Sequence, residues 1–223
     1  MNDSPGVRID PEVSRVRALP GRFGPPLAVV SVVAAIALVV LGILFAGQSE
    51  GAPVDVGIRA YLRSLQQPWH QIALVIDWTG EPVGYTVVLA IFVLVFLRKG
   101  NRRAAVLAVA GTATAVALTT GMKPLVGRTI NDGFLSYPSG HTATATAFAL
   151  VATLAAGRLW LTAVVTVLAA AAMAWAQVLL NAHYPTDTFG GFCAALAIVP
   201  AVAWVVDAAL DRLSARRSGG TPA

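Results

Sequence analysis

The chain has 223 residues, of which 57% are hydrophobic and only 12% are charged. Soluble domains carry about 25% charged residues, so this chain has too little charge to cover the surface of a water-soluble fold. The composition also excludes intrinsic disorder and collagen-like repeats, and the single cysteine excludes a disulfide scaffold. The net charge of +5 has to be interpreted from where the basic residues lie.

Six apolar segments follow one another along the chain, and each is long enough, or nearly so, to cross a membrane. A transmembrane helix needs about 20 mostly apolar residues. The predicted spans cover about residues 26–47, 82–97, 104–122, 142–156, 159–180 and 188–206. Only Gly157 and Arg158 separate the fourth span from the fifth, which favours a tight helical hairpin. The sequence therefore predicts an all-α polytopic membrane protein, a six-transmembrane-helix bundle.

The segments outside these spans predict two tails and a connector. Residues 1–25 and 208–223 are expected to be tails around a membrane domain at 26–207, and residues 1–25 and 214–223 are expected to be flexible. In the connector after the first span, apolar and polar residues alternate at helical spacing. The apolar set is Ile58, Tyr61, Leu62 and Leu65, and the polar set is Asp55, Arg59, Arg63 and Gln66. This pattern favours an amphipathic helix on the outer membrane surface with Trp69 and Trp78 as interfacial anchors; a solvated connector is the alternative.

The basic residues predict the orientation, because Lys and Arg concentrate in short cytoplasmic segments. With the N-terminus inside, 12 of the 16 basic residues fall on the inner side: Arg8, Arg15, Arg17, Arg22, Arg98, Lys99, Arg102, Arg103, Arg158, Arg212, Arg216 and Arg217. Arg59, Arg63, Lys123 and Arg128 remain outside. We therefore expect a multi-pass protein of the plasma (inner) membrane with both termini cytoplasmic. The positive charge follows from this topology and does not indicate nucleic-acid binding.

Three short segments on the predicted outer side carry residues suited to chemistry on an anion. Tyr137-Pro138-Ser139-Gly140-His141 opens the fourth span. Ser139 can cap the helix there, and exposed N–H groups at a helix N-terminus, together with the positive end of the helix dipole, favour an anion. His141 then lies in the first helical turn. The alternative is that Ser139 only caps and that His141 only lies at the interface.

Lys123 and Arg128, which follow the third span, would place two cations next to this anion site. Basic residues at the ends of spans also serve as anchors whose charged ends reach the lipid headgroups. The sequence leaves both interpretations open.

His183 and Asp187 are four residues apart, between the fifth and sixth spans. In a helical turn the carboxylate can accept from the imidazole N–H and orient the ring, leaving the other nitrogen free as a nucleophile. Pro185 is compatible with this if it opens a new helix. The two residues could also be unrelated, or form half of a metal site, although no third ligand of suitable spacing accompanies them. Together with His141 as a proton donor, the three segments suit phosphoryl transfer without a metal or cofactor.

These residues resemble the pattern of the type 2 phosphatidic acid phosphatase superfamily, which includes bacterial lipid phosphate and undecaprenyl-diphosphate phosphatases. Pro-Ser-Gly-His at 138–141 and the later His-x-x-x-Asp match the family motifs, in the same order and layout. The resemblance implies that His183 attacks phosphorus to form a phosphohistidine, that Asp187 orients it, and that His141 protonates the leaving oxygen and then activates water. Ser139, Gly140 and Lys123 would hold phosphate oxygens.

Two family arginines have no counterpart in this chain. The position of the Arg-Pro pair falls on Ile130-Asn131, and the arginine before the nucleophilic histidine is replaced by Gln177. We expect Arg128 to take over the first role as a phosphate ligand. Gln177 can hydrogen-bond phosphate but offers neither charge nor a bidentate fork.

The sequence thus predicts a membrane phosphatase that acts on a lipid phosphate or diphosphate at the extracytoplasmic face. Polyprenyl diphosphates and polyprenyl-phosphate sugars are favoured by family analogy, while phosphatidic acid and phosphatidylglycerol phosphate remain open. The expected partners are the lipid phosphate substrate and membrane lipids, without nucleic acid, and a homo-oligomer stays open. The alternative is a non-catalytic lipid-phosphate binder or flippase-like carrier on the same scaffold, which the missing arginines favour and the paired His183 and Asp187 oppose.

Overall fold

The computed structural model describes residues 17–218, and this part of the chain is almost entirely helical. The helices are α1 (Gly24–Leu44), α2 (Pro53–Arg63), α3 (Trp69–Trp78), α4 (Pro82–Arg98), α5 (Arg102–Val126), α6 (Gly140–Ala156), α7 (Leu159–Leu179) and α8 (Pro185–Ser218). A short 3-10 turn, η2 (Gly21–Phe23), precedes α1. The predicted all-α class is confirmed.

The structure supports fewer membrane crossings than the six that the sequence predicts. Among the described residues, α1, α5, α7 and α8 are long and apolar enough to cross a membrane. The pair α3 and α4 would make a fifth span, with a bend of 63° at the break between them. Helix α6 is apolar but only 17 residues long. The described residues therefore support four or five spans by length and composition, and a sixth crossing by α6 stays a prediction.

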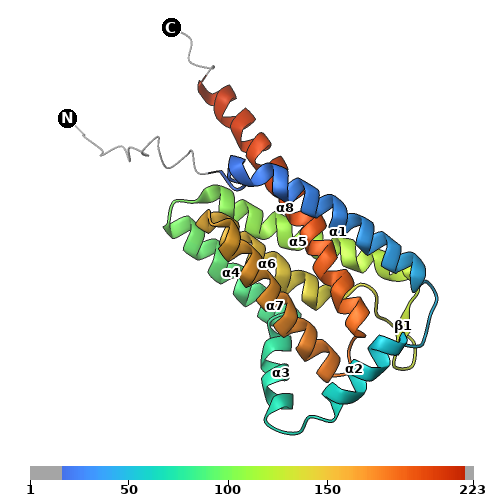
Figure 1. The fold of residues 1–223 in the computed structure, drawn as a ribbon. Coiled ribbons are helices and arrows are strands. Elements are labelled where there is room, and N and C mark those ends of the chain that lie inside the picture. The colour runs from blue at the N-terminus through green and yellow to red at the C-terminus, as the bar shows by residue number, and fades with distance from the viewer. Residues whose placement is uncertain (1–16, 219–223) are drawn as a thin grey trace.

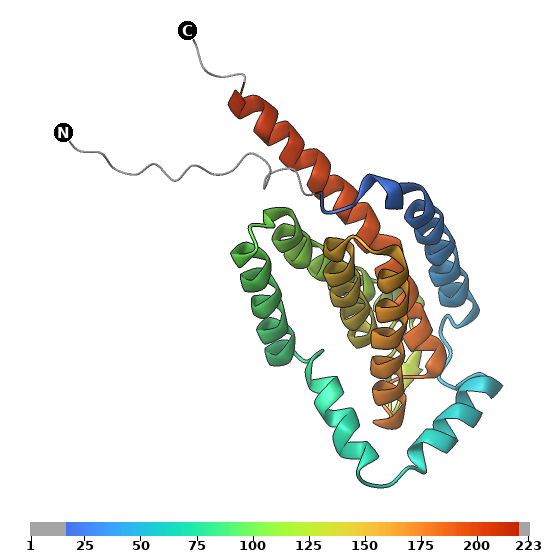
Figure 2. The same cartoon turned by 60° about the vertical axis from the view of Figure 1, so that its left-hand side comes forward.

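The bundle is built around α6 (Figure 1). Helices α5, α7 and α8 all pack against α6, and α1 covers the outside of α8. Helix α4 packs on α5, whereas α3 packs on α7; Figure 2 shows how the bend between α3 and α4 lets the pair reach both neighbours. Small residues occupy much of the centre, including the fully buried Ala108, Ala115, Ala147 and Ala195. Such residues let membrane helices approach closely, which favours van der Waals packing.

The bundle has two distinct ends. Helix α1 begins and α8 ends at one of them, while α2, α3 and the segment between α5 and α6 lie at the other (Figure 1). At the first end, the carboxylate of Asp207 accepts hydrogen bonds from the backbone N–H groups of Ala18 and Leu19, at 2.9 Å each, and pairs with Arg103 at 2.9 Å. The first described residues are thus fixed to α8.

These contacts change the predicted tails. Residues 17–25 are ordered, and α8 continues without interruption to Ser218, into the segment from Ser214 that was expected to be flexible. The remaining tail residues, 1–16 and 219–223, lie outside the described part of the chain.

A two-stranded hairpin between α5 and α6 was not expected from the sequence. Strands β1 (Thr129–Ile130) and β2 (Phe134–Leu135) pair antiparallel, and Asn131, Asp132 and Gly133 make the turn with positive φ angles of 41°, 57° and 101°. Asn, Asp and Gly tolerate this left-handed backbone best. The hairpin places Ile130 inward, 3% exposed, at the position where the family has its arginine.

Candidate active site

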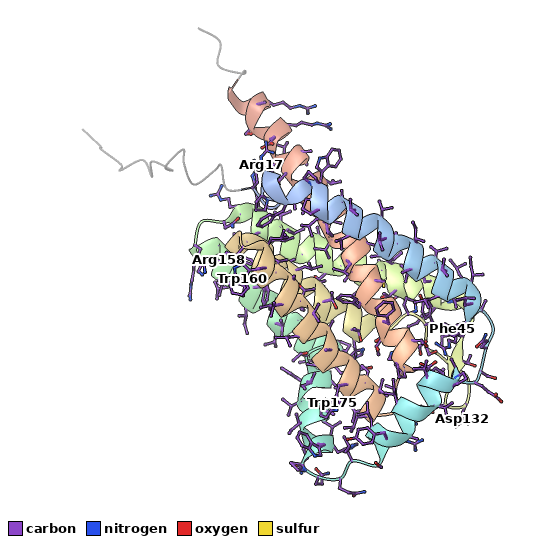
Figure 3. The ribbon with its side chains drawn as sticks, in the orientation of Figure 1. Arg17, Phe45, Asp132, Arg158, Trp160 and Trp175 are labelled. Atoms are coloured by element: carbon purple, nitrogen blue, oxygen red, sulfur yellow. The ribbon has the colours of Figure 1, made fainter. Side chains whose placement is uncertain are left out.

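The predicted site residues gather at the end of the bundle formed by α2 and the hairpin. Figure 3 shows Phe45 and Asp132 at this end, and Arg17 and Arg158 at the opposite one. The site is built from the last turn of α5, the loop that opens α6, and the loop between α7 and α8. These three elements come from distant parts of the sequence, and the bundle brings them together as the topology predicts.

The N-terminus of α6 has the geometry of a capped helix. Ser139 is extended, with φ −68° and ψ 116°, and its Oγ accepts from the N–H of Thr142 at 3.3 Å. The backbone N–H of Ser139 donates to the carbonyl of Asp187 at 3.0 Å, which ties this loop to the start of α8. The predicted N-cap role of Ser139 is confirmed, and the first turn of α6, with Gly140 and His141, presents the positive end of the helix dipole.

Helix α8 reaches this loop because residue 191 is a glycine. A Cβ built on Gly191 would lie 2.2 Å from the carbonyl oxygen of Ser139, far inside van der Waals contact. The glycine therefore permits the close approach that brings α8, and with it Asp187, against the start of α6.

His183 lies in the loop before α8 and is 6% exposed. Its Nδ1 is 3.7 Å from Oδ2 of Asp187, which is longer than a hydrogen bond, and this nitrogen has no hydrogen-bond partner among the described residues. Catalytic contacts of this kind are often long without substrate and shorten when it binds. Burial lowers the pKa of His183, the charges of Lys123 and His141 lower it further, and the carboxylate of Asp187 opposes them. The ring is therefore neutral near pH 7, the form in which a nitrogen can act as a nucleophile.

Arg128 forms ion pairs that the sequence did not indicate. Its guanidinium is completely buried and pairs with two carboxylates, Asp187 at 2.6 Å and Asp55 at 2.9 Å. It also donates to Oγ1 of Thr186 at 2.7 Å. The centre of the Phe45 ring lies 4.0 Å from the guanidinium carbon Cζ. Arg128 thus faces two acids and an aromatic ring in this structure, which differs from the expected place among phosphate ligands.

Lys123 lies in the last turn of α5 and is half-buried. Its Nζ donates to the carbonyl of Leu135 in the hairpin at 3.1 Å. Its charge acts on both His183 and Asp187, so Lys123 lies close enough to contribute to the potential at the site.

His141 faces two carboxylates from the break between α3 and α4. Its Nε2 lies 3.5 Å from Oδ1 of Asp77 and 3.5 Å from Oε1 of Glu81. The ring fits against Gly80, where a Cβ would lie 2.3 Å from Cδ2 of His141. Gln177 donates through its Nε2 to the same oxygen, Oδ1 of Asp77. The amide that replaces a family arginine is therefore bound to an acid next to His141.

The ligand atoms of Asp77, Glu81 and His141 lie within 4.8 Å of one another, a spacing that could hold a metal ion. The same arrangement suits a protonated His141 between two acids. A metal bound there would occupy Nε2 of His141 and prevent it from exchanging a proton. The predicted pair of His183 and Asp187 is not part of this group.

The sequence interpretation missed three acids that shape the site. Asp55 was placed on the polar face of the connector helix, yet its side chain is completely buried. Asp77 and Glu81 were not singled out. Asp77 was detectable, since an acid inside an apolar run of a membrane protein is a functional candidate by default. Burial of Asp55 could not be read from helical spacing, because its partner Arg128 comes from 73 residues further along the chain.

Comparison with known proteins gave a family match and a similar fold. Residues 104–211 match the model of the PAP2 superfamily. The fold is similar to a crystal structure described as the first transmembrane PAP2-type phosphatidylglycerolphosphate phosphatase from Bacillus subtilis, with a TM-score of 0.62. The two chains are 19% identical, and the match covers 80% of this chain and 96% of the other; at this identity the likeness concerns the fold. A comparison with curated proteins gave no match.

The matched residues include all three motif segments, and Asp55, Asp77 and Glu81 lie before them. The resemblance drawn from the motifs is thus confirmed by a family match that contains them and by a fold shared with a transmembrane PAP2-type protein. Residues 104–211 of this chain thus match the PAP2 superfamily, and the chain shares its fold with a transmembrane PAP2-type phosphatidylglycerolphosphate phosphatase.

Proposed function

We propose that the chain is an integral membrane phosphatase that hydrolyses a lipid phosphate or diphosphate through a phosphohistidine intermediate. The observation that carries the proposal is the buried imidazole of His183 beside Asp187, with its pKa lowered, next to the capped start of α6. A protein that only binds lipid phosphate has no need of a neutral nucleophile oriented by a carboxylate.

In the proposed reaction, Nε2 of His183 attacks phosphorus while the bond to the leaving oxygen breaks. His141 gives its proton to that oxygen, so the lipid departs as an alcohol, or as a monophosphate when the substrate is a diphosphate. Water then attacks the phosphohistidine, and His141 takes its proton. Asp187 stabilises the charge that develops on His183.

The negative charge of the phosphoryl group is proposed to be balanced by three groups. These are the N–H groups at the start of α6, the hydroxyl of Ser139 and the ammonium of Lys123. Preorganised donors of this kind stabilise a transition state most where water is excluded, and Ser139 is completely buried. The step needs no metal, because no oxygen has to be activated before His183 attacks.

Orientation and substrate are further parts of the proposal. The distribution of basic residues supports an extracytoplasmic site, since Arg98, Lys99, Arg102 and Arg158 lie at the ends of helices far from the α2 end. A polyprenyl-linked phosphate remains our favoured substrate. Phosphatidylglycerol phosphate is the first competitor, because it is the substrate class named for the similar Bacillus subtilis protein.

The test is phosphate release by the purified protein across a panel of lipid phosphates, with and without EDTA. We expect turnover that survives EDTA and disappears in His183→Ala. Vanadate should inhibit, because it mimics the five-coordinate phosphorus bound to the histidine. Phosphate binding without turnover on any substrate would instead favour the binder or carrier. Turnover that is lost with EDTA and restored by Mg²⁺ or Zn²⁺ would contradict the mechanism.

A further inference from the structure

We propose that Arg128 and Asp55 are positioning residues that fix Asp187 against His183, and that Arg128 does not bind the substrate phosphate. The inference rests on the proposed function, because it assigns these residues a task in the same reaction. It gives a role to a buried acid outside the part of the chain that matches the family, residues 104–211.

The guanidinium of Arg128 is closed off from the site. Nη1 donates to Asp187 and Thr186, and Nη2 donates to Asp55. The aromatic rings of Phe45 and Tyr184 lie 4.0 Å and 4.5 Å from the guanidinium carbon. Nε is buried as well, and within residues 17–218 it has no hydrogen-bond partner. A phosphate oxygen could reach Arg128 only by displacing these groups.

The two carboxylate oxygens of Asp187 face different partners: Oδ1 faces Arg128, and Oδ2 faces His183. Oδ1 accepts from Arg128 at 2.6 Å. Oδ2 accepts from the N–H of Tyr184 at 3.0 Å and faces Nδ1 of His183 at 3.7 Å. With Oδ1 held by the charged guanidinium and Oδ2 held by the N–H of Tyr184, the carboxylate cannot rotate away from the ring. Arg128 thereby sets the direction in which Asp187 presents Oδ2.

Asp55 completes the arrangement from α2. Its Oδ1 accepts from the N–H of Thr186 at 2.9 Å, and its Oδ2 accepts from the hydroxyl of Thr186 at 2.8 Å and from Arg128 at 2.9 Å. Thr186 directly precedes Asp187, so Asp55 fixes the backbone as well as the guanidinium. A buried charge needs partners of this quality, since an unpaired one costs several kcal/mol. Residues from α2, the α5–β1 link and the start of α8 are thus fixed as one unit.

This role differs measurably from that of a phosphate ligand. A phosphate ligand contributes to the affinity for inorganic phosphate, whereas a positioning residue affects only states in which His183 has to be aligned with phosphorus. A misplacement of about 1 Å can cost about 100-fold in rate. For Asp55→Asn we expect kcat and vanadate affinity to fall together by about 10- to 100-fold. The inhibition constant of inorganic phosphate should stay within about two-fold.

The experiment compares Asp55→Asn with Asp132→Asn, which makes the same change at an exposed hairpin residue and leaves the unit intact. Thr186→Val is the milder variant, because it removes one hydroxyl and keeps the backbone N–H that donates to Asp55. If Asp55→Asn proves too unstable to purify, Thr186→Val takes its place, and its kcat should fall by a smaller factor. Arg128→Lys, which keeps the charge but loses the fork, should show the same split between kcat and phosphate inhibition.

A second readout does not depend on turnover. The chain has three histidines, so the ring nitrogens of ¹⁵N-histidine-labelled protein can be assigned with one variant each. Asp55→Asn should change the tautomer or titration of His183 and leave His70 unchanged. Equal kcat and an unchanged His183 spectrum in Asp55→Asn would overturn the proposal, and so would a loss of phosphate affinity that parallels kcat. Absence of wild-type turnover would refute the proposed function, and the spectra would still decide whether Asp55 positions His183.

Discussion

At the scale of single residues, the burial of His183 decides its chemistry. Desolvation of the charged form outweighs the attraction of Asp187 and lowers the pKa of the imidazole below its ordinary value of about 6.5. The free enzyme should therefore hold a neutral nucleophile well into the mildly acidic range. The acid limb of kcat/KM, which reports the free enzyme, should lie below pH 6.5.

Asp187→Asn tests the cause of this shift. Because the carboxylate raises the pKa of His183 against burial, its removal should lower that pKa further and move the acid limb to still lower pH, while kcat falls through lost orientation. The measurement is a pH profile of kcat/KM for the wild type and the variant. A limb that moves to higher pH would show that the carboxylate of Asp187 does not raise the pKa of His183.

Gln177 shows why a family arginine cannot simply be restored. Its amide donates to Asp77. The guanidinium of Gln177→Arg would therefore pair with that acid and add little to the affinity for phosphate. The single variant should change the inhibition constant of inorganic phosphate by less than about three-fold. With Asp77→Asn added, the guanidinium is free, and the constant should fall by about 10-fold or more, since a hydrogen bond to a charged group contributes about 1.5–3 kcal/mol. An equal gain in the single and double variants would contradict this pairing.

At the scale of elements, the approach of α8 to α6 depends on a residue without a side chain. Gly191→Ala would bring a methyl group within 2.2 Å of the carbonyl of Ser139, so the helices must separate. We expect a loss of about 1–3 kcal/mol of stability, as for other overpacked cores, and lower turnover because the Ser139 and Asp187 loops move apart. Gly121→Ala in α5 is the matched control, since a Cβ there has nothing within 4 Å. Melting temperature and phosphate release of both variants in detergent decide the comparison.

Elements with a local signal could be predicted from the sequence, whereas those fixed by distant partners could not. The cap of α6 and the start of α8 at Pro185 follow from residues within one turn. The hairpin at 129–135 and the ordered residues before α1 depend on contacts from elsewhere, such as Asp207 with Ala18. The pair of His183 and Asp187, which we propose to be catalytic, was detectable through its spacing of four. The burial of Asp55 beside Arg128 was not, because nothing local distinguishes a buried acid from a solvated one on the polar face of a helix. Asp77 beside His141 could be noticed only because it lies inside an apolar run.

At the scale of the whole molecule, the site residues and most of the basic residues lie at opposite ends of the bundle. The site residues gather at the end formed by α2 and the hairpin, whereas Arg103 and Arg158 lie at the other, where α8 emerges. If the positive-inside rule sets the orientation, a lipid phosphate has to reach the outer face before hydrolysis. The orientation is therefore the property that links the fold to a cellular role.

Accessibility of single cysteines tests this orientation. In a Cys193→Ala background, Phe134→Cys places a thiol on the hairpin at a position that is 74% exposed, and Lys99→Cys places one at the exposed end of α4. An impermeant maleimide should label the first in intact cells, because the hairpin belongs to the end that carries the site. It should label the second only after lysis, since Lys99 belongs to the basic end, which we propose to be cytoplasmic. The opposite pattern would place His183 on the cytoplasmic side, and the substrate would then have to be a lipid phosphate of the inner leaflet.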